Sequence, residues 1–113
     1  MIIWNTQIDA LFQATGVPLF NIDINNWAFK KSDALIIIND LLLSKIPILG
    51  GDVFVKCENK IYHSYDSWYF NRITDVSFDE YLQKSIETAR SFVLNYKEID
   101  RKTLPLFAIV PDV

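Results

Sequence analysis

Residues 46–69 constrain the fold of this chain more than any other stretch. Their sequence is IPILGGDVFVKCENKIYHSYDSWY, in which two alternating runs flank the polar triplet Glu58, Asn59 and Lys60. Alternation with a period of two is typical of β-strands, and a short polar connection between two such runs predicts a β-hairpin. We therefore expect an antiparallel sheet built on this hairpin.

The hairpin has two faces, whose pairing depends on the length of its turn. In the first strand, one face is formed by Val53, Val55 and Cys57. In the second strand, one face is formed by Ile61, His63 and Tyr65. A turn of two residues and a turn of three bring different faces together, and the sequence leaves both registers open. Before the hairpin, Gly50 and Gly51 are expected to bend the chain. The Asp52 side chain is expected to hydrogen-bond to the backbone of this bend.

The N-terminal third contains two helical segments separated by a connection. Asn5 or Thr6 is expected to cap a short first helix, and Gly16 to end it in a left-handed conformation. The asparagine-rich residues 19–31 predict a connection with one brief extended piece that packs Phe20, Trp27 and Phe29 against the core.

Residues 33–45 predict a second, largely buried helix. Ser32 is its expected N-cap, and Asp33 lies where a helix N-terminus favours negative charge. Helical spacing assigns Ile37 to the more polar stripe that includes Asp40, opposite a wide apolar surface.

The C-terminal half predicts a long helix followed by a strand. Ser77 and Glu80 form a capping-box pattern before an apolar stripe of period 3.6 that runs to Tyr96. A charged connection, 98–102, leads to the apolar run 104–110, which is expected to join the hairpin as a third antiparallel strand. The sequence thus predicts one α+β domain over residues 1–113, with a small antiparallel sheet packed against about three helices.

Composition excludes several classes of function. The net charge is −3 and the pI is about 5.0, so no broad cationic surface is expected to bind nucleic acid. One cysteine and one histidine cannot form an internal disulfide or a usual zinc cluster, and no cofactor motif is present. The apolar runs are too short to span a membrane, and the N-terminus lacks a signal-peptide pattern, so we expect a cytoplasmic protein.

Two motifs suggest chemistry but have simpler structural explanations. Cys57 and His63 resemble a nucleophile and its base, yet a two-residue turn separates their faces and a three-residue turn leaves them about 7 Å apart. The Gly50-Gly51-Asp52 element precedes a strand and lacks the lysine of a phosphate-binding loop. We therefore interpret Gly50, Gly51 and Asp52 as structural.

The remaining polar and aromatic residues, which have no such structural explanation, include the candidates for binding a partner. Asp40 lies on the polar stripe of an otherwise apolar helix. Trp68 is expected in the core, aimed inward by an Asx-type turn at Asp66 and Ser67. Tyr65, Asp66 and Tyr69 are expected at the surface, where aromatic and charged residues dominate binding.

Two sequence pieces together carry a resemblance to a known family. Residues 46–54 (IPILGGDVF) and residues 65–69 (YDSWY), followed by a helix with Tyr81, Ser85 and Ala89, resemble the immunity protein 40 family of bacterial polymorphic toxin systems. Ser67 departs from the asparagine expected between the aspartate and the tryptophan.

The resemblance implies a small α+β inhibitor, not an enzyme, that binds and occludes a cognate toxin domain. Contacts are expected at Asp40, Tyr65, Asp66, Tyr69 and the turn residues 58–60. Two alternatives remain: a small enzyme that uses His63 with Asp52 or Asp66, and a structural module that oligomerises through the edge of its sheet. The sequence leaves the oligomeric state open.

Overall fold

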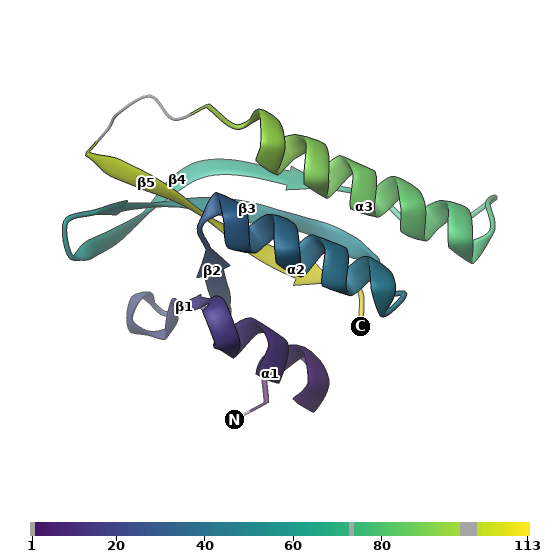
Figure 1. Ribbon diagram of the computed structural model, residues 1–113, viewed down its shortest axis with the longest axis horizontal. Coiled ribbons are helices and arrows are strands. Elements are labelled where there is room, and N and C mark those ends of the chain that lie inside the picture. The colour runs from purple at the N-terminus through teal and green to yellow at the C-terminus, as the bar shows by residue number, and fades with distance from the viewer. Residues whose placement is uncertain (1, 73, 98–101) are drawn as a thin grey trace.

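The computed structural model describes residues 2–72, 74–97 and 102–113, and its described elements form an α+β fold (Figure 1). The three α-helices are α1 (Thr6–Thr15), α2 (Lys31–Leu43) and α3 (Phe78–Asn95), and η1 (Phe20–Ile22) is a short 3-10 helix. The five strands are β1 (Val17–Pro18), β2 (Trp27–Phe29), β3 (Ile48–Cys57), β4 (Lys60–Tyr69) and β5 (Thr103–Pro111). The expected fold class is confirmed; of the expected charged connection, residues 98–101 lie outside the described residues.

The sheet is antiparallel throughout, with the order β1-β2-β5-β3-β4. The hairpin β3–β4 is confirmed, and β5 pairs with β3 as its third member. Cys57 pairs with Lys60, so the turn consists of two residues, Glu58 and Asn59. Glu58 has a φ of 58°, in the left-handed region that tight hairpin turns use.

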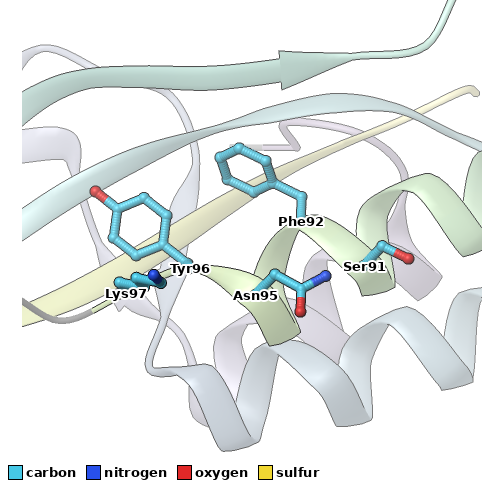
Figure 2. A pocket seen from close by; sticks show the side chains of 5 residues that line it. All are labelled: Ser91, Phe92, Asn95, Tyr96 and Lys97. Atoms are coloured by element: carbon cyan, nitrogen blue, oxygen red, sulfur yellow. The ribbon is translucent and has the colours of Figure 1, made fainter.

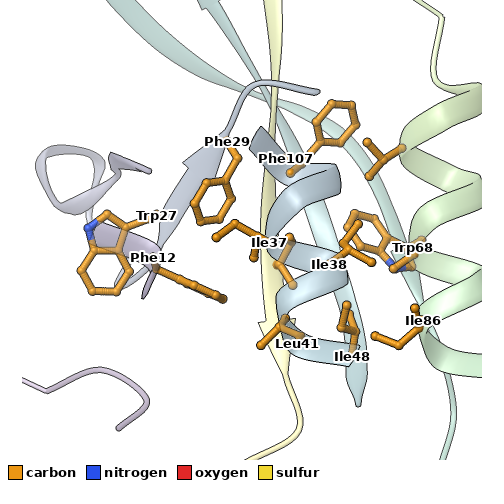
Figure 3. Close-up of a cluster of buried hydrophobic side chains, with 14 of the residues drawn as sticks. Phe12, Trp27, Phe29, Ile37, Ile38, Leu41, Ile48, Trp68, Ile86 and Phe107 are labelled. Carbon is orange, nitrogen blue, oxygen red and sulfur yellow. The ribbon is translucent and has the colours of Figure 1, made fainter. Parts of the chain in front are cut away.

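The main core lies between the sheet and the helices α2 and α3, which cover the same face of the sheet (Figure 1). Figure 3 shows its side chains converging from the strands, α1 and α2, including Phe12, Phe29, Ile38, Leu41, Ile48 and Phe107. The expected cap of α3 is confirmed, because the Glu80 backbone N–H donates to Ser77 Oγ at 3.1 Å.

The opposite face of the sheet, called the open face below, is only half covered. A second cluster packs the segment that contains η1 against β2, β5 and the middle of β3; its buried members are Leu19, Ala28, Phe54, Leu106 and Ala108. The part of the open face along β4 carries exposed side chains instead. A surface available to a partner is therefore left on the hairpin.

The expected bend at Gly50 and Gly51 is wrong. Both glycines lie inside β3, which pairs with β4 on one side and β5 on the other. A Cβ on Gly51 would overlap the Ala108 carbonyl and the Trp68 ring. The glycines therefore allow neighbouring groups to approach the backbone closely, and Asp52 follows in a continuous strand.

Several N-terminal details also differ from expectation. Gly16 has an extended backbone, with a φ of −78°, and is required because a Cβ there would come within 2.6 Å of Trp27 Cβ. Lys30, not Ser32, is the N-cap of α2. The connection 19–31 contains β2, whose three residues are all buried, whereas Phe20 is exposed.

The orientation of α2 was also mispredicted in part. Ile37 is only 2% exposed, whereas Ile36 is 59% exposed. Both are isoleucines in a continuous apolar run, so local hydrophobicity cannot distinguish them. Packing against α3 and the sheet decides which of them is buried.

Candidate binding surface on strand β4

The edge strand β4 is interrupted by a bulge in its middle. Phe54 pairs with His63 and Asp52 pairs with Ser67, so Val53 alone lies opposite the three residues 64–66. Ser64 Oγ donates to the Val53 carbonyl at 2.6 Å and accepts from the Asp66 backbone N–H at 3.2 Å. These bonds replace part of the missing ladder and fix the bulge.

Tyr65 is presented to solvent by this bulge. It has a φ of 68°, a conformation that is unfavourable for a bulky side chain, and it is 87% exposed. Its backbone N–H donates to His63 Nδ1 at 2.8 Å, and the two rings stack with centroids 5.0 Å apart. Tyr65 is therefore held in place before any partner binds, which reduces the entropic cost of binding.

His63 lies between Tyr65 and Asp52 on the open face. Its Nδ1 lone pair accepts the Tyr65 N–H, and its Nε2 lies 3.9 Å from Asp52 Oδ1. Because Nδ1 accepts this hydrogen bond, the proton of the neutral imidazole is on Nε2, which faces the carboxylate. Neither ring nitrogen therefore has a lone pair free to accept another proton. His63 is thus not set up as a general base in this geometry.

The other suggested partners of His63 lie elsewhere. Phe54 pairs with His63, so these two side chains share a face of the sheet. Cys57 follows Phe54 by three residues on β3, so its side chain points to the opposite face, as expected for a two-residue turn. Asp66 also points to the helix side, where it binds Tyr96. The enzyme alternative therefore retains only Asp52, which lies beyond hydrogen-bond distance of the imidazole.

Asp66 joins β4 to the end of α3. The Tyr96 hydroxyl donates to Asp66 Oδ2 at 2.6 Å, and burial, followed by this hydrogen bond, raises the pKa of Tyr96. Figure 2 shows Phe92 and Tyr96 projecting toward the strands at the end of α3. Both residues line a hollow of about 430 Å³. Asp66 therefore contributes to the packing of α3 as well as to the exposed surface.

Trp68 belongs to the core and not to the surface. It is 7% exposed and stacks on Phe92, with ring centroids 4.8 Å apart. The expected Asx-type turn is wrong, because Asp66 and Ser67 are within β4. Strand alternation turns the indole inward, and its Nε1–H has no hydrogen-bond partner among the described residues.

The structure brings only part of the predicted contact set together. Tyr65 and Tyr69 lie on the open face of β4, where Tyr69 is 76% exposed. The turn residues Glu58 and Asn59 and the first residue of β4, Lys60, are exposed at the tip of the hairpin. Asp40 is in the last turn of α2, which ends near the start of β3 and far from that tip (Figure 1). Because β3 is ten residues long, about 33 Å of strand separates its two ends.

Two residues of this surface were not expected to contribute to it. Asp52 is on the open face beside His63, and Tyr96 anchors Asp66. The alternation of Asp52 with Phe54 and Lys56 was a signal for the first. No local pattern links Tyr96 to Asp66, because they are thirty residues apart.

The described part of the chain contains neither a cluster of metal ligands nor a membrane-spanning helix. No three acidic, histidine or cysteine side chains within 2–72, 74–97 and 102–113 converge on a point where an ion would bind. None of the helices formed by these residues has the length and apolar character needed to cross a bilayer.

These features define a small α+β protein with an exposed aromatic and acidic surface on the edge strand of its sheet. The family model described as Immunity protein 40 matches residues 18–111, and the chain belongs to this family. Searches of the curated proteins and of the solved structures found no match.

Proposed function

We propose that the protein is an immunity protein that binds a cognate toxin domain and neutralises it by covering the active site or a neighbouring surface. Membership of the immunity protein 40 family supports a toxin as the partner. The protein would act in the bacterial cytoplasm, where a free cysteine such as Cys57 stays reduced.

The conformation of Tyr65 is the observation that supports a toxin contact on strand β4. Tyr65 is 87% exposed although its backbone has an unfavourable positive φ, and its stacking on His63 leaves most of its side chain available to a partner. Exposed, preorganised aromatic side chains are typical anchors of protein interfaces. Tyr69 lies four residues along the same strand and enlarges the aromatic surface.

The bulge also argues against the alternative of oligomerisation through the sheet edge. An uninterrupted edge strand offers a regular row of N–H and C=O groups to a second strand. In β4 the N–H groups of Tyr65 and Asp66 are already bonded to side chains. The bulge therefore interrupts, in the middle of β4, the row of backbone groups that a second strand would need.

The test is co-expression with the toxin domain encoded beside the gene for this protein. We expect the wild-type protein to restore growth and to co-purify with that domain. Tyr65→Ser and Tyr69→Ser should each weaken binding by more than about tenfold, as expected for hot-spot residues. Leu43→Ser, which changes an equally exposed apolar residue on α2, is the matched control.

Two results would contradict the proposal. Absence of both growth rescue and complex formation with wild-type protein would reject the immunity function. Normal binding by both tyrosine variants, together with loss of binding by Leu43→Ser, would assign the contact to α2 and reject the β4 surface.

A further inference from the structure

A shallow hollow lies on the open face at the start of the hairpin. Its volume is about 300 Å³, and it is lined by residues of three adjacent strands, among them Gly50, Asp52, Ser67, Tyr69 and Val110. Gly50 pairs with Tyr69 and with Val110 and lines the hollow, although a Cβ on it would meet the Trp68 carbonyl of β4. The hollow thus lies between an aspartate and a tyrosine on neighbouring strands.

The Asp52 carboxylate in this hollow lacks a strong partner. Among the residues that the structure describes, its one ion-pair contact is His63, at 3.9 Å, and its side chain is 43% exposed. Asp52 also no longer has the structural role expected from the sequence, since β3 does not bend there. Its carboxylate is therefore available to a cation from outside.

Tyr69 and Ser67 supply complementary groups on the same side of the sheet. They flank the inward-facing Trp68 and so share the open face with Asp52, which pairs with Ser67. A tyrosine ring attracts a cation above its face, and a hydroxyl accepts a hydrogen bond. A carboxylate, a ring and a hydroxyl together fit a planar cationic group.

We propose that this hollow receives the guanidinium group of an arginine side chain on the toxin. Arginine is favoured over lysine because its planar fork can bond a carboxylate at two points while it stacks on an aromatic ring. The net charge of −3 also favours a basic partner surface. This inference rests on the proposed function for the identity of the partner.

The chain contains a related arrangement within its own fold. The Arg72 guanidinium lies 5.7 Å from the centroid of the Tyr81 ring, whose hydroxyl donates to Asp112 Oδ2 at 2.9 Å. There all three residues come from this chain. In the hollow the tyrosine and aspartate are present, and the partner supplies the arginine.

The first test does not require the toxin. N-acetyl-arginine amide is titrated into the full-length protein, and backbone amide chemical shifts of Gly50, Ser67 and Tyr69 are followed by NMR. We expect saturable shifts that N-acetyl-lysine amide produces more weakly. Asp52→Asn should abolish them, whereas Glu58→Gln, at the hairpin tip, should not. Absence of shifts in the wild type, or equal shifts in Asp52→Asn, would overturn the inference.

The second test uses the neighbouring toxin domain. Asp52→Asn should weaken its binding by about tenfold or more and reduce the salt dependence of the affinity, while Glu87→Gln, at an exposed carboxylate of α3, should have a smaller effect. If the wild type binds and Asp52→Asn binds equally well, the arginine site is rejected and the immunity function stands. If the wild type does not bind, the immunity function fails, and the titration with the arginine amide still decides whether the hollow accepts a guanidinium.

Discussion

Gly51 and Trp68 are cross-strand partners, and the indole ring occupies the space that a side chain on Gly51 would need. The same register pairs Gly50 with Tyr69 and Asp52 with Ser67. The two sequence pieces that carry the family resemblance are therefore one structural unit, in which glycines on β3 accommodate the aromatic residues of β4.

Gly51→Ala should destabilise the protein strongly. Its Cβ would overlap both the Ala108 carbonyl and the Trp68 ring, and backbone atoms cannot move aside as a flexible side chain can. We expect the free energy of unfolding to fall by at least about 2 kcal/mol in urea denaturation. Ser67→Ala, at the exposed neighbour of Trp68, is the control and should change it by less than about 0.5 kcal/mol. Equal stability of the two variants would contradict the close packing.

Substitutions of Tyr65 should rank by their tolerance of positive φ. Asparagine adopts the left-handed conformation more readily than most residues, whereas a β-branched side chain is strongly disfavoured there. We therefore expect Tyr65→Val to be less stable than Tyr65→Asn by about 1 kcal/mol, measured by thermal or urea unfolding. At Tyr62, a β4 residue without positive φ, the same pair should reverse in order, because valine favours strands.

The hydrogen bond between Tyr96 and Asp66 should couple β4 to α3. A double-mutant cycle with Tyr96→Phe and Asp66→Ala should give a coupling energy of about 0.5–1.5 kcal/mol in the free energy of unfolding. In the control cycle, Tyr62→Phe replaces Tyr96→Phe. Tyr62 lies on the same strand as Asp66, but the hydroxyl that bonds to Asp66 is that of Tyr96. A coupling energy near zero in the first cycle would show that the bond adds nothing to stability.

Tyr81 should make the protein sensitive to alkaline pH. Burial, followed by the hydrogen bond to Asp112, raises the pKa of Tyr81 from 10.0 to about 12. The stabilisation by its protonated hydroxyl is complete below pH 10 and is lost between pH 10 and 12, because the unfolded tyrosine ionises first. The free energy of unfolding should fall by up to about 1.4 kcal/mol per pH unit over this range.

Tyr81→Phe isolates this contribution from those of the other tyrosines. The variant should show a shallower decline in stability between pH 10 and 12 than the wild type, in urea unfolding at fixed ionic strength. Tyr65→Phe, which changes an exposed tyrosine, should keep the wild-type slope. Parallel curves for Tyr81→Phe and the wild type would show that ionisation of Tyr81 does not limit stability.

Local patterns in the sequence were sufficient for the elements that depend on neighbouring residues. The hairpin follows from alternation on both sides of a polar turn, and α3 follows from its cap and its apolar stripe. The surface exposure of Tyr65 and Tyr69 could also be anticipated. Each is an odd number of positions away from Trp68 on the same strand, so each points to the face opposite the buried indole. Each of these inferences needs only a few consecutive residues.

The sequence by itself thus determined an α+β protein organised around residues 46–69. Only the tertiary structure decided that β5 lies between β2 and β3, that the glycines continue a strand, and that a bulge presents Tyr65 beside His63. These features depend on pairing between segments that are distant along the chain. Local propensity and periodicity carry no information about which strands become neighbours or in which register they pair, so the binding surface emerges only when the sheet is assembled.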